Sequence, residues 1–362
     1  MMKRTFTYFI CAATLMISGC ARTVEEGPNE ANKRYFDAWL HINYPELEES
    51  ATGLGIYIIP EYTVEGNGEL VKKEGYAICD YIITDLDGNI TSYTERNIAL
   101  QLGDDSLGVY FGPQVITTHK NSIQAGVAEG LVGMKVGGKK KFIVPSWLMT
   151  YSSYSSAKDY LSKESSFSNT IYDLTVRDFT TDILQWQVDS IGRFFNNDDI
   201  LIFGKPAKET FSGMSAKDSV VADKGGAFGF YYKSVEAAST TEKFPSDTTV
   251  YINYTGRLLN GQVFDTTIEK VAIDNDIHTN KTYEPVPVSW ADKYSELKLS
   301  GNTVVSGFAM TLWQMKAGEK GVGVFYSPLG YGTTGSTQNG GKTYTIPGYA
   351  TLIFEIEMTA KP

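Results

Sequence analysis

An internal repeat is the feature of this sequence that most constrains its fold. Residues 126–135 read GVAEGLVGMK and residues 307–316 read GFAMTLWQMK, with glycine, alanine, methionine and lysine at matching places. Each segment follows a predicted long strand that runs into a glycine-containing turn, and such a turn between apolar runs is a strong hairpin signal. Solenoid repeats have periods of about 20–50 residues, so a unit of roughly 150 residues predicts two tandem domains instead.

The two halves share one order of predicted elements. Each begins with a helical pattern, continues with a short and then a longer strand, and ends with an amphipathic helix and a closing strand. This order predicts an α+β fold in which an antiparallel sheet packs on one short helix. The expected division is a leader at 1–19, a tether at 20–32, a first domain at 33–180, a helix and linker at 181–228, and a second domain at 229–362. Within the linker, residues 206–224 are expected to be polar and irregular.

Charge and the content of histidine and cysteine exclude several classes of function. The 362-residue chain carries 32 basic and 42 acidic residues, a net charge of −10, whereas nucleic-acid binders have a basic footprint. Three histidines and three cysteines leave little for a zinc site or a disulfide framework. We therefore expect no nucleic-acid partner, no metal and no cofactor, and we assign no role to His41, His119 or His278.

The first residues are typical of an export signal. Lys3 and Arg4 form a short positive region, and the apolar run that follows is too short to span a bilayer. Residues 17–20 read ISGC, which resembles the lipobox of bacterial lipoproteins, in which the cysteine is acylated and becomes the first mature residue. The resemblance implies lipidation at Cys20 and a location in the bacterial cell envelope, anchored by lipid at the outer membrane or the periplasmic face. The alternative is a plain secretory signal in which Cys20 is incidental.

Four sequence blocks of the second half resemble one enzyme family. Residues 250–267 read VYINYTGRLLNGQVFDTT, 304–316 read VVSGFAMTLWQMK, 327–332 read SPLGYG and 346–357 read IPGYATLIFEIE. In this order they closely resemble the FKBP-type peptidyl-prolyl cis-trans isomerases. The resemblance covers residues from about 229 to the end and implies two tandem FKBP-like domains, each an antiparallel sheet wrapped on a short helix.

Rotation about an X–Pro bond needs a particular kind of site. Its barrier is roughly 18–20 kcal/mol because the amide is resonance-stabilised. Twisting the amide requires no nucleophile, metal or general base, only an apolar cradle that excludes water and a few donors aimed at the twisting carbonyl. The family resemblance assigns this site to Tyr254, Phe264, Asp265, Val304, Val305, Phe308, Tyr331, Ile346 and Phe354.

The resemblance also implies a role for each of these side chains. Tyr254, Phe264 and Phe354 would form walls, with Phe308 as the floor. Val305 would offer its backbone N–H to the substrate, Tyr331 would offer its hydroxyl to a carbonyl, and Asp265 would be a buried carboxylate near the twisted amide. Each residue alone also fits a structural role, since aromatic side chains commonly pair across strands. The ordered set favours the pocket.

The second half departs from the family pattern at three places. The floor position, commonly tryptophan, is Phe308, which keeps the apolar surface without the indole N–H. The position usually aromatic on one side of the pocket is Val286. Two loops at the expected mouth, 270–289 and 332–345, are longer than the family norm and bear on peptide preference and rate.

The first half repeats the pattern of the second but lacks most of its predicted pocket residues. Aligning the shared phrases places Tyr81 at the Tyr254 position, but Thr91 and Ser92 replace Phe264 and Asp265. Val127 replaces Phe308 and Thr150 replaces Tyr331. We therefore expect the first domain to keep the fold and to lack the pocket. The basic run at 139–141 is expected to be a solvated strand edge.

These observations favour a lipid-anchored peptidyl-prolyl isomerase that assists the folding of exported proteins, with its activity in the second domain. Its partners would be proline-containing polypeptide clients and, through the anchor, a membrane. The alternative is a non-catalytic peptide-binding or chaperone lipoprotein of the envelope. A third hypothesis is a purely structural envelope lipoprotein.

Overall fold

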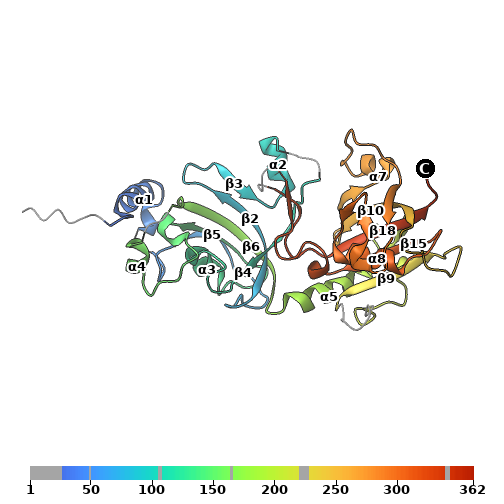
Figure 1. The fold of residues 1–362 in the computed structure, drawn as a ribbon. Coiled ribbons are helices and arrows are strands. Elements are labelled where there is room, and N and C mark those ends of the chain that lie inside the picture. Colours follow the sequence, from blue (N-terminus) through green and yellow to red (C-terminus); the bar gives the residue numbers. More distant parts are fainter. Residues whose placement is uncertain (1–26, 49, 105–107, 164–165, 220–227, 339–342) are drawn as a thin grey trace, which may run out of the picture.

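The structure is a computed structural model that describes residues 27–48, 50–104, 108–163, 166–219, 228–338 and 343–362. It is an α+β fold with antiparallel sheets, as predicted. Two units, each with its own curved sheet, lie side by side, with helix α5 at their junction and helix α1 at the far end of the first unit (Figure 1). Cys20 and the expected leader at 1–19 lie outside the described residues. None of the described helices is both long enough and apolar enough to cross a membrane.

The first unit contains a six-stranded sheet in the order β1-β5-β6-β2-β3, with β4 also paired to β2. Its elements are α1 (Glu30–Asn43), η1 (Pro45–Leu47), β1 (Tyr57–Val64), β2 (Tyr76–Thr84), β3 (Ile90–Tyr93), α2 (Arg96–Leu102), β4 (Gln114–Thr117), α3 (Ala125–Leu131), β5 (Lys139–Val144), η2 (Ser146–Leu148), α4 (Ala157–Leu161) and β6 (Thr170–Thr180).

The second unit contains an eight-stranded sheet in the order β14-β13-β12-β10-β18-β15-β9, with β11 paired to β10, and a separate β16-β17 hairpin. Its elements are β9 (Phe230–Glu236), β10 (Thr249–Leu258), β11 (Val263–Thr266), α7 (Glu269–Asp274), β12 (Val286–Ser289), η3 (Tyr294–Glu296), β13 (Lys298–Leu299), β14 (Asn302–Thr303), α8 (Ser306–Gln314), β15 (Lys320–Phe325), η4 (Ser327–Leu329), β16 (Ser336–Gln338), β17 (Thr343–Ile346) and β18 (Leu352–Thr359).

The two large sheets share a strand order over their common part. The series β1-β5-β6-β2 corresponds to β9-β15-β18-β10, with β3 and β4 pairing β2 as β11 and β12 pair β10. The hydrogen bonds match as well. Tyr81 N–H donates to Thr94 Oγ1 at 3.0 Å and Tyr254 N–H donates to Thr267 Oγ1 at 2.9 Å. This correspondence puts Tyr81 and Tyr254 at the same place in the two units.

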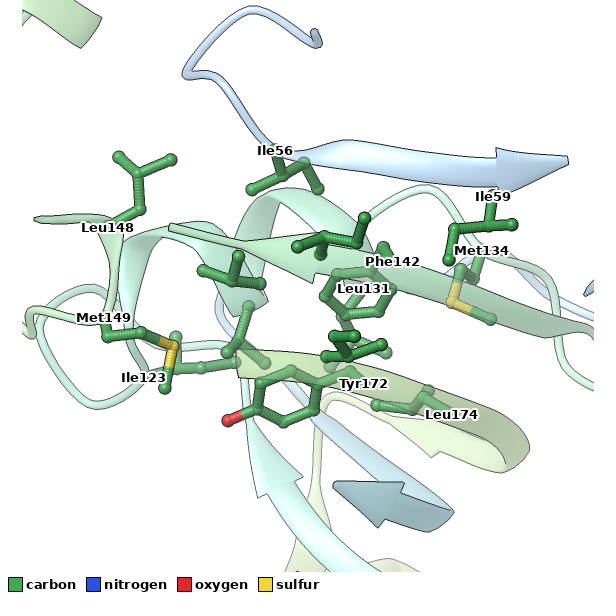
Figure 2. Packing of buried hydrophobic residues seen from close by; sticks show 14 of the residues in the cluster. Ile56, Ile59, Ile123, Leu131, Met134, Phe142, Leu148, Met149, Tyr172 and Leu174 are labelled. Carbon is green, nitrogen blue, oxygen red and sulfur yellow. The ribbon is translucent and has the colours of Figure 1, made fainter. Parts of the chain in front are cut away.

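In both units a glycine lets the helix approach the sheet closely, but the glycine lies on the helix in one unit and on the strand in the other. In the first unit, a Cβ on Gly130 of α3 would lie 2.5 Å from the Phe142 ring of β5, which leaves room only for glycine. In the second unit the glycine is on the strand, because a Cβ on Gly323 would lie 1.9 Å from Thr311 Oγ1 of α8. Figure 2 shows Phe142, Leu131 and Tyr172 close together in the first core. The close contact between helix and strand is thus kept in both units, with the small and the large residue on opposite elements.

The segment between the units begins with the predicted helix, but its residues 206–211 are not the polar, irregular stretch that was expected. It contains α5 (Ile183–Phe194), the strand pair β7 (Leu201–Ile202) and β8 (Lys205–Pro206), and α6 (Ala207–Thr210). Phe195, Ile202 and Phe211 are at most 2% exposed and form one buried cluster with Val322 and Ile353 of the second sheet. The prediction was wrong at residues 206–211, because Phe211 is an isolated apolar residue in a polar stretch, which local periodicity does not identify.

The basic run at 139–141 is also placed differently from the prediction. It lies in β5, which is paired on both sides, with β1 and with β6, so it is not a sheet edge. Lys139 pairs with Asp173 at 3.1 Å, Lys140 Nζ donates to the Gly130 carbonyl at 2.8 Å, and Lys141 lies over the Tyr62 ring. Burial lowers the pKa of Lys140. These lysines serve the structure of the first unit.

Candidate functional site

The predicted aromatic residues of the second unit meet around Phe354. The Phe354 ring lies edge-on to Phe308 with 4.8 Å between centroids and edge-on to Phe264 at 5.6 Å. Tyr254 is 6.2 Å from Phe354 and 5.6 Å from Phe308. Edge-to-face pairs at these separations are favourable because ring edges are positive and ring faces negative. Four aromatic side chains from β10, β11, α8 and β18 thus form one cluster.

Burial differs within this cluster. Phe308 and Phe354 are 2% and 5% exposed, so they are anchored in the core. Tyr254 and Phe264 are half-buried and form its outer part. Gly256, which the sequence analysis did not single out, makes the arrangement possible, because a Cβ there would lie 2.6 Å from the Phe264 ring. The sequence indicated this glycine, because it ends the tripeptide Tyr-Thr-Gly in β10.

Asp265 is part of the same site but is not the buried carboxylate that was expected, since its side chain is 41% exposed. Tyr254 donates its hydroxyl to Asp265 Oδ2 at 2.5 Å, and the Lys281 ammonium lies 2.9 Å from Oδ1. The Thr266 N–H also donates to Oδ1 at 2.9 Å. The Asp265 carboxylate is thus partly exposed to solvent and is held by the Tyr254 hydroxyl, the Lys281 ammonium and the Thr266 N–H. Lys281 lies in the long loop before β12. The family resemblance did not predict this residue, because the loop is longer than the family norm.

The two tyrosines of the site remain protonated at neutral pH. Burial is the largest cause that raises the pKa of Tyr254, and the charge of Asp265 and its hydrogen bond add to the effect. Burial and the charge of Asp265 also raise the pKa of Tyr331. Tyr331 is 38% exposed, so its hydroxyl can act as a hydrogen-bond donor at the surface of the site.

The Tyr331 loop is fixed by a short network that the sequence analysis did not predict. The Ser327 carbonyl of η4 accepts hydrogen bonds from the N–H groups of Gly330 and Gly332, both at 2.9 Å. Ser327 itself is bonded to Gln187 of α5, outside the second sheet. Because the contact joins residues 140 positions apart, no local sequence pattern indicates it.

The remaining predicted residues lie at the start of α8 and at the end of β17. Val304 and Val305 are half-buried against the second core, and Val305 is the N-cap residue of α8. The Val305 N–H donates to no backbone carbonyl of the described residues. Ile346 ends β17 and is 3% exposed. Val286, at the position that is usually aromatic, packs on the same core from β12. Of the flap at 332–345, residues 339–342 lie outside the described residues.

The matching place in the first unit carries different chemistry. Strand pairing puts Ile83 opposite Tyr172 and Gly256 opposite Phe354, so Tyr172 occupies the Phe354 position. Ser92 pairs with Ile83 as Asp265 pairs with Gly256. The carboxylate of the second unit thus has a serine counterpart. Within the described residues, no group of three or more His, Cys, Asp or Glu side chains is arranged to hold a metal ion.

Comparison with known proteins gives one family model, which matches within the second unit, and several similar proteins. Residues 240–359 match the family model of the FKBP-type peptidyl-prolyl cis-trans isomerases. The chain is 32% identical over 130 residues, 36% of its length, to a probable FKBP-type peptidyl-prolyl cis-trans isomerase of Haemophilus influenzae, covering 42% of that protein. It is 32% identical over 112 residues, 31% of its length, to peptidyl-prolyl cis-trans isomerase FKBP15-2 of Arabidopsis thaliana, covering 52% of that protein. The chain thus spans about half the length of these curated relatives.

Two solved structures are similar at lower identity. The three FKBP domains of wheat FKBP73 align at 15% identity and a TM-score of 0.28, over 84% of this chain and 94% of that one. A peptidyl-prolyl cis-trans isomerase from Pseudomonas syringae pv. tomato aligns at 24% identity and a TM-score of 0.24, over 36% of this chain and 74% of that one. The family model and the two curated relatives carry the assignment. Residues 240–359 are therefore similar to an FKBP-type peptidyl-prolyl cis-trans isomerase domain.

Proposed function

We propose that the chain is a peptidyl-prolyl cis-trans isomerase whose activity resides in the second unit. The observation that carries this proposal is the aromatic cluster of Tyr254, Phe264, Phe308 and Phe354, which lies within the family-matched segment. Phe308 and Phe354 provide a dry apolar base, and Tyr254 and Phe264 provide half-buried walls against which a proline ring can pack.

The proposed mechanism is rotation without proton transfer. Binding in an apolar environment removes water from the X–Pro amide and weakens the resonance form that carries separated charge. In this proposal the Val305 N–H and the Tyr331 hydroxyl are the donors that bind the substrate as the amide twists. Asp265 is held by Tyr254 and Lys281, so in this mechanism it positions Tyr254 and does not act as a base.

A protease-coupled assay with a proline-containing tetrapeptide tests the activity. The full chain should accelerate isomerisation, which takes about 10–100 s without a catalyst at 25 °C. Phe264→Ala in the second unit should abolish nearly all activity of the full chain. The equivalent change in the first unit, Thr91→Ala, is the matched control and should leave the rate unchanged. Failure of the full chain to accelerate isomerisation would favour a non-catalytic peptide-binding protein.

We propose further that the first unit is a second, inactive FKBP-like domain. The shared strand order and the matched hydrogen bonds of Tyr81 and Tyr254 support a common origin. Thr91, Ser92 and Val127 replace the aromatic wall, the carboxylate and the floor of the second unit. The first unit therefore lacks the side chains on which the proposed mechanism depends.

The proposed setting is the bacterial cell envelope, with the protein anchored by lipid at Cys20 and acting on exported proline-containing polypeptides. The lipobox-like ISGC at residues 17–20 and the positive residues Lys3 and Arg4 support this proposal. Slow prolyl isomerisation limits the folding of many chains, so an isomerase located where exported proteins fold would serve them directly.

A further inference from the structure

The first unit contains a large cavity away from the position that matches the isomerase site. Its volume is about 650 Å³, and it lies beside helix α3, between the segment after β4 and the loop after η2. Ala125, Ala128 and Ile123 give it an apolar side, and Tyr151, Ser152 and Ser153 lie at its edge. A cavity of this size accommodates a large side chain or a small molecule.

The second unit shows why the cavity exists. Alignment of the repeated phrases places Glu129 at the position of Met310 and Val132 at the position of Trp313. The strand pairs Ala77↔Ile116 and Val250↔Val288 place Thr118 at the position of Trp290. A matched hydrogen bond supports this alignment, because Glu74 N–H donates to the Thr118 carbonyl and Asp247 N–H donates to the Trp290 carbonyl.

In the second unit these positions are filled with aromatic side chains. Trp290 and Trp313 stack with 5.8 Å between centroids and 11° between planes, and Phe244 packs on Trp290 at 4.7 Å. Trp290 and Met310 are 5% and 3% exposed. In the first unit Thr118, Glu129 and Val132 all line the cavity. The surrounding backbone is kept while the side chains that would fill the cavity are smaller or polar, so the space is large enough to admit an aromatic group.

Glu129 adds a polar feature to this space. Its Oε1 accepts the Leu54 N–H at 2.7 Å. Its Oε2 is buried and has no hydrogen-bond partner among the described residues. Buried polar atoms are nearly always hydrogen-bonded in folded proteins, so this oxygen is an acceptor that lacks its donor. Glu129 lines the cavity, so a ligand with an N–H group beside an aromatic ring would fit the space and, after a rotation of the Glu129 side chain, would supply the missing donor.

We propose that this cavity binds a tryptophan side chain of a polypeptide ligand, with the ring in the space that Trp290 and Trp313 fill in the second unit and the indole N–H directed to Glu129. Tryptophan is the amino-acid side chain that combines a large aromatic surface with a single N–H donor. The first unit would then hold a client polypeptide at a site that is separate from the isomerase site. This inference does not rest on the proposed isomerase activity.

Fluorescence anisotropy with the full chain tests the proposal. The probes are three fluorescein-labelled, proline-free decapeptides of glycine and serine that differ at one central residue, which is tryptophan, phenylalanine or alanine. Without proline they do not depend on the isomerase site, so failure here and failure of the isomerase assay are separate results. The tryptophan peptide should bind at least about tenfold more tightly than the alanine peptide, with phenylalanine between them, as for a buried aromatic anchor.

Two variants locate the site. Val132→Trp restores the residue of the second unit and fills the cavity, so it should weaken binding of the tryptophan peptide by at least about tenfold. Leu70→Trp, at a position that is 47% exposed and outside the cavity lining, is the matched control and should bind like the parent chain. Tyr151→Ala, at an edge residue that is 46% exposed, should also weaken binding and does not require new packing in the core.

Circular dichroism and thermal unfolding establish that each variant is folded, and the tetrapeptide isomerase rate should not change. Equal affinity for the three peptides would overturn the proposal, as would undiminished binding by both Val132→Trp and Tyr151→Ala. Sedimentation is measured in parallel. A dimer of the parent chain that Val132→Trp dissociates would make a second copy of this chain the occupant and would likewise overturn the proposal.

Discussion

Gln187 and Ser327 exchange two hydrogen bonds across the boundary between helix α5 and the second unit. Gln187 Nε2 donates to Ser327 Oγ at 3.1 Å, and the Ser327 N–H donates to Gln187 Oε1 at 2.7 Å. Both residues are buried, at 0% and 2% exposure. Since the Ser327 carbonyl binds the amides on either side of Tyr331, a helix outside the family-matched segment fixes the loop that presents Tyr331.

Replacing Gln187 with alanine should therefore affect both stability and activity. The change leaves the Ser327 N–H and hydroxyl buried without partners, which costs roughly 1–3 kcal/mol per unsatisfied group. We expect a lower free energy of unfolding in urea and a lower kcat, because Tyr331 is held less firmly. The matched control is Gln185→Ala on the exposed side of the same helix. Loss of stability with an unchanged kcat would show that Gln187 has no part in positioning Tyr331.

Membrane attachment can be tested at Cys20. The lipobox is the only anchor that the sequence analysis predicts, so Cys20→Ala should move the protein from the membrane to the soluble fraction. Stable anchoring by acyl chains requires more than one chain, and removal of the acylated residue removes all of them. Fractionation followed by immunoblotting measures the distribution. If the variant remains in the membrane fraction after normal cleavage of the leader, the lipoprotein hypothesis is wrong.

Much of the second unit's site could be predicted from sequence, because its residues lie in short blocks with a fixed order. Tyr254 and Phe264 flank one hairpin, and Phe308 and Phe354 lie in the helix and strand that pack against it. The structure brings these four side chains together as the resemblance implied. Their proximity follows from the pairing of β10 with β11 and with β18.

The features that sequence reasoning missed depend on contacts between distant residues. Lys281, whose ammonium lies 2.9 Å from Asp265 Oδ1, is in a loop with no counterpart in the resemblance. Gln187 meets Ser327 from another part of the chain. Phe211 is buried by the outer face of the second sheet, although its neighbours in sequence are polar. Each depends on tertiary packing, which local periodicity does not encode.

Two substitutions in the site distinguish rotation in a dry pocket from acid–base chemistry. Phe264→Ala removes a half-buried wall and admits water, so we expect a loss of kcat/KM of at least about a hundredfold, close to what removal of a key catalytic contact costs. Asp265→Asn keeps the shape and an acceptor for the Tyr254 hydroxyl, so its effect should be much smaller.

The tetrapeptide assay measures both variants after urea unfolding has shown that they are folded. Phe354→Ala is a less suitable variant, since truncating a buried phenylalanine costs about 3–5 kcal/mol of stability. If Asp265→Asn in a folded protein abolishes activity while Phe264→Ala does not, the carboxylate takes part in the chemistry and the rotation mechanism is wrong.

The tyrosines provide a prediction of how stability depends on pH. Burial, with smaller contributions from nearby aspartates, raises the pKa of Tyr110 and of Tyr231 to about 12, and the same causes raise the pKa of Tyr254. In the unfolded chain tyrosine titrates near 10. Above that pH the unfolded state binds fewer protons than the folded state, so the free energy of unfolding falls as pH rises. The stabilisation is complete below about pH 10 and is lost between about 10 and 12.

Urea unfolding between pH 6 and pH 11.5 measures this dependence. Tyrosine ionisation should contribute no slope up to pH 8, and a decline should begin near pH 10, where exposed tyrosine starts to ionise. Tyr231→Phe should make the decline shallower, because it removes one group whose pKa is raised by burial. The control is Tyr35→Phe, at a position that is 55% exposed.

The isomerase rate should also be nearly flat between pH 6 and 8, since no step of the proposed mechanism transfers a proton. A bell-shaped rate profile in that range, in a protein whose stability is constant, would require a titrating acid or base and would replace rotation in a dry pocket as the mechanism.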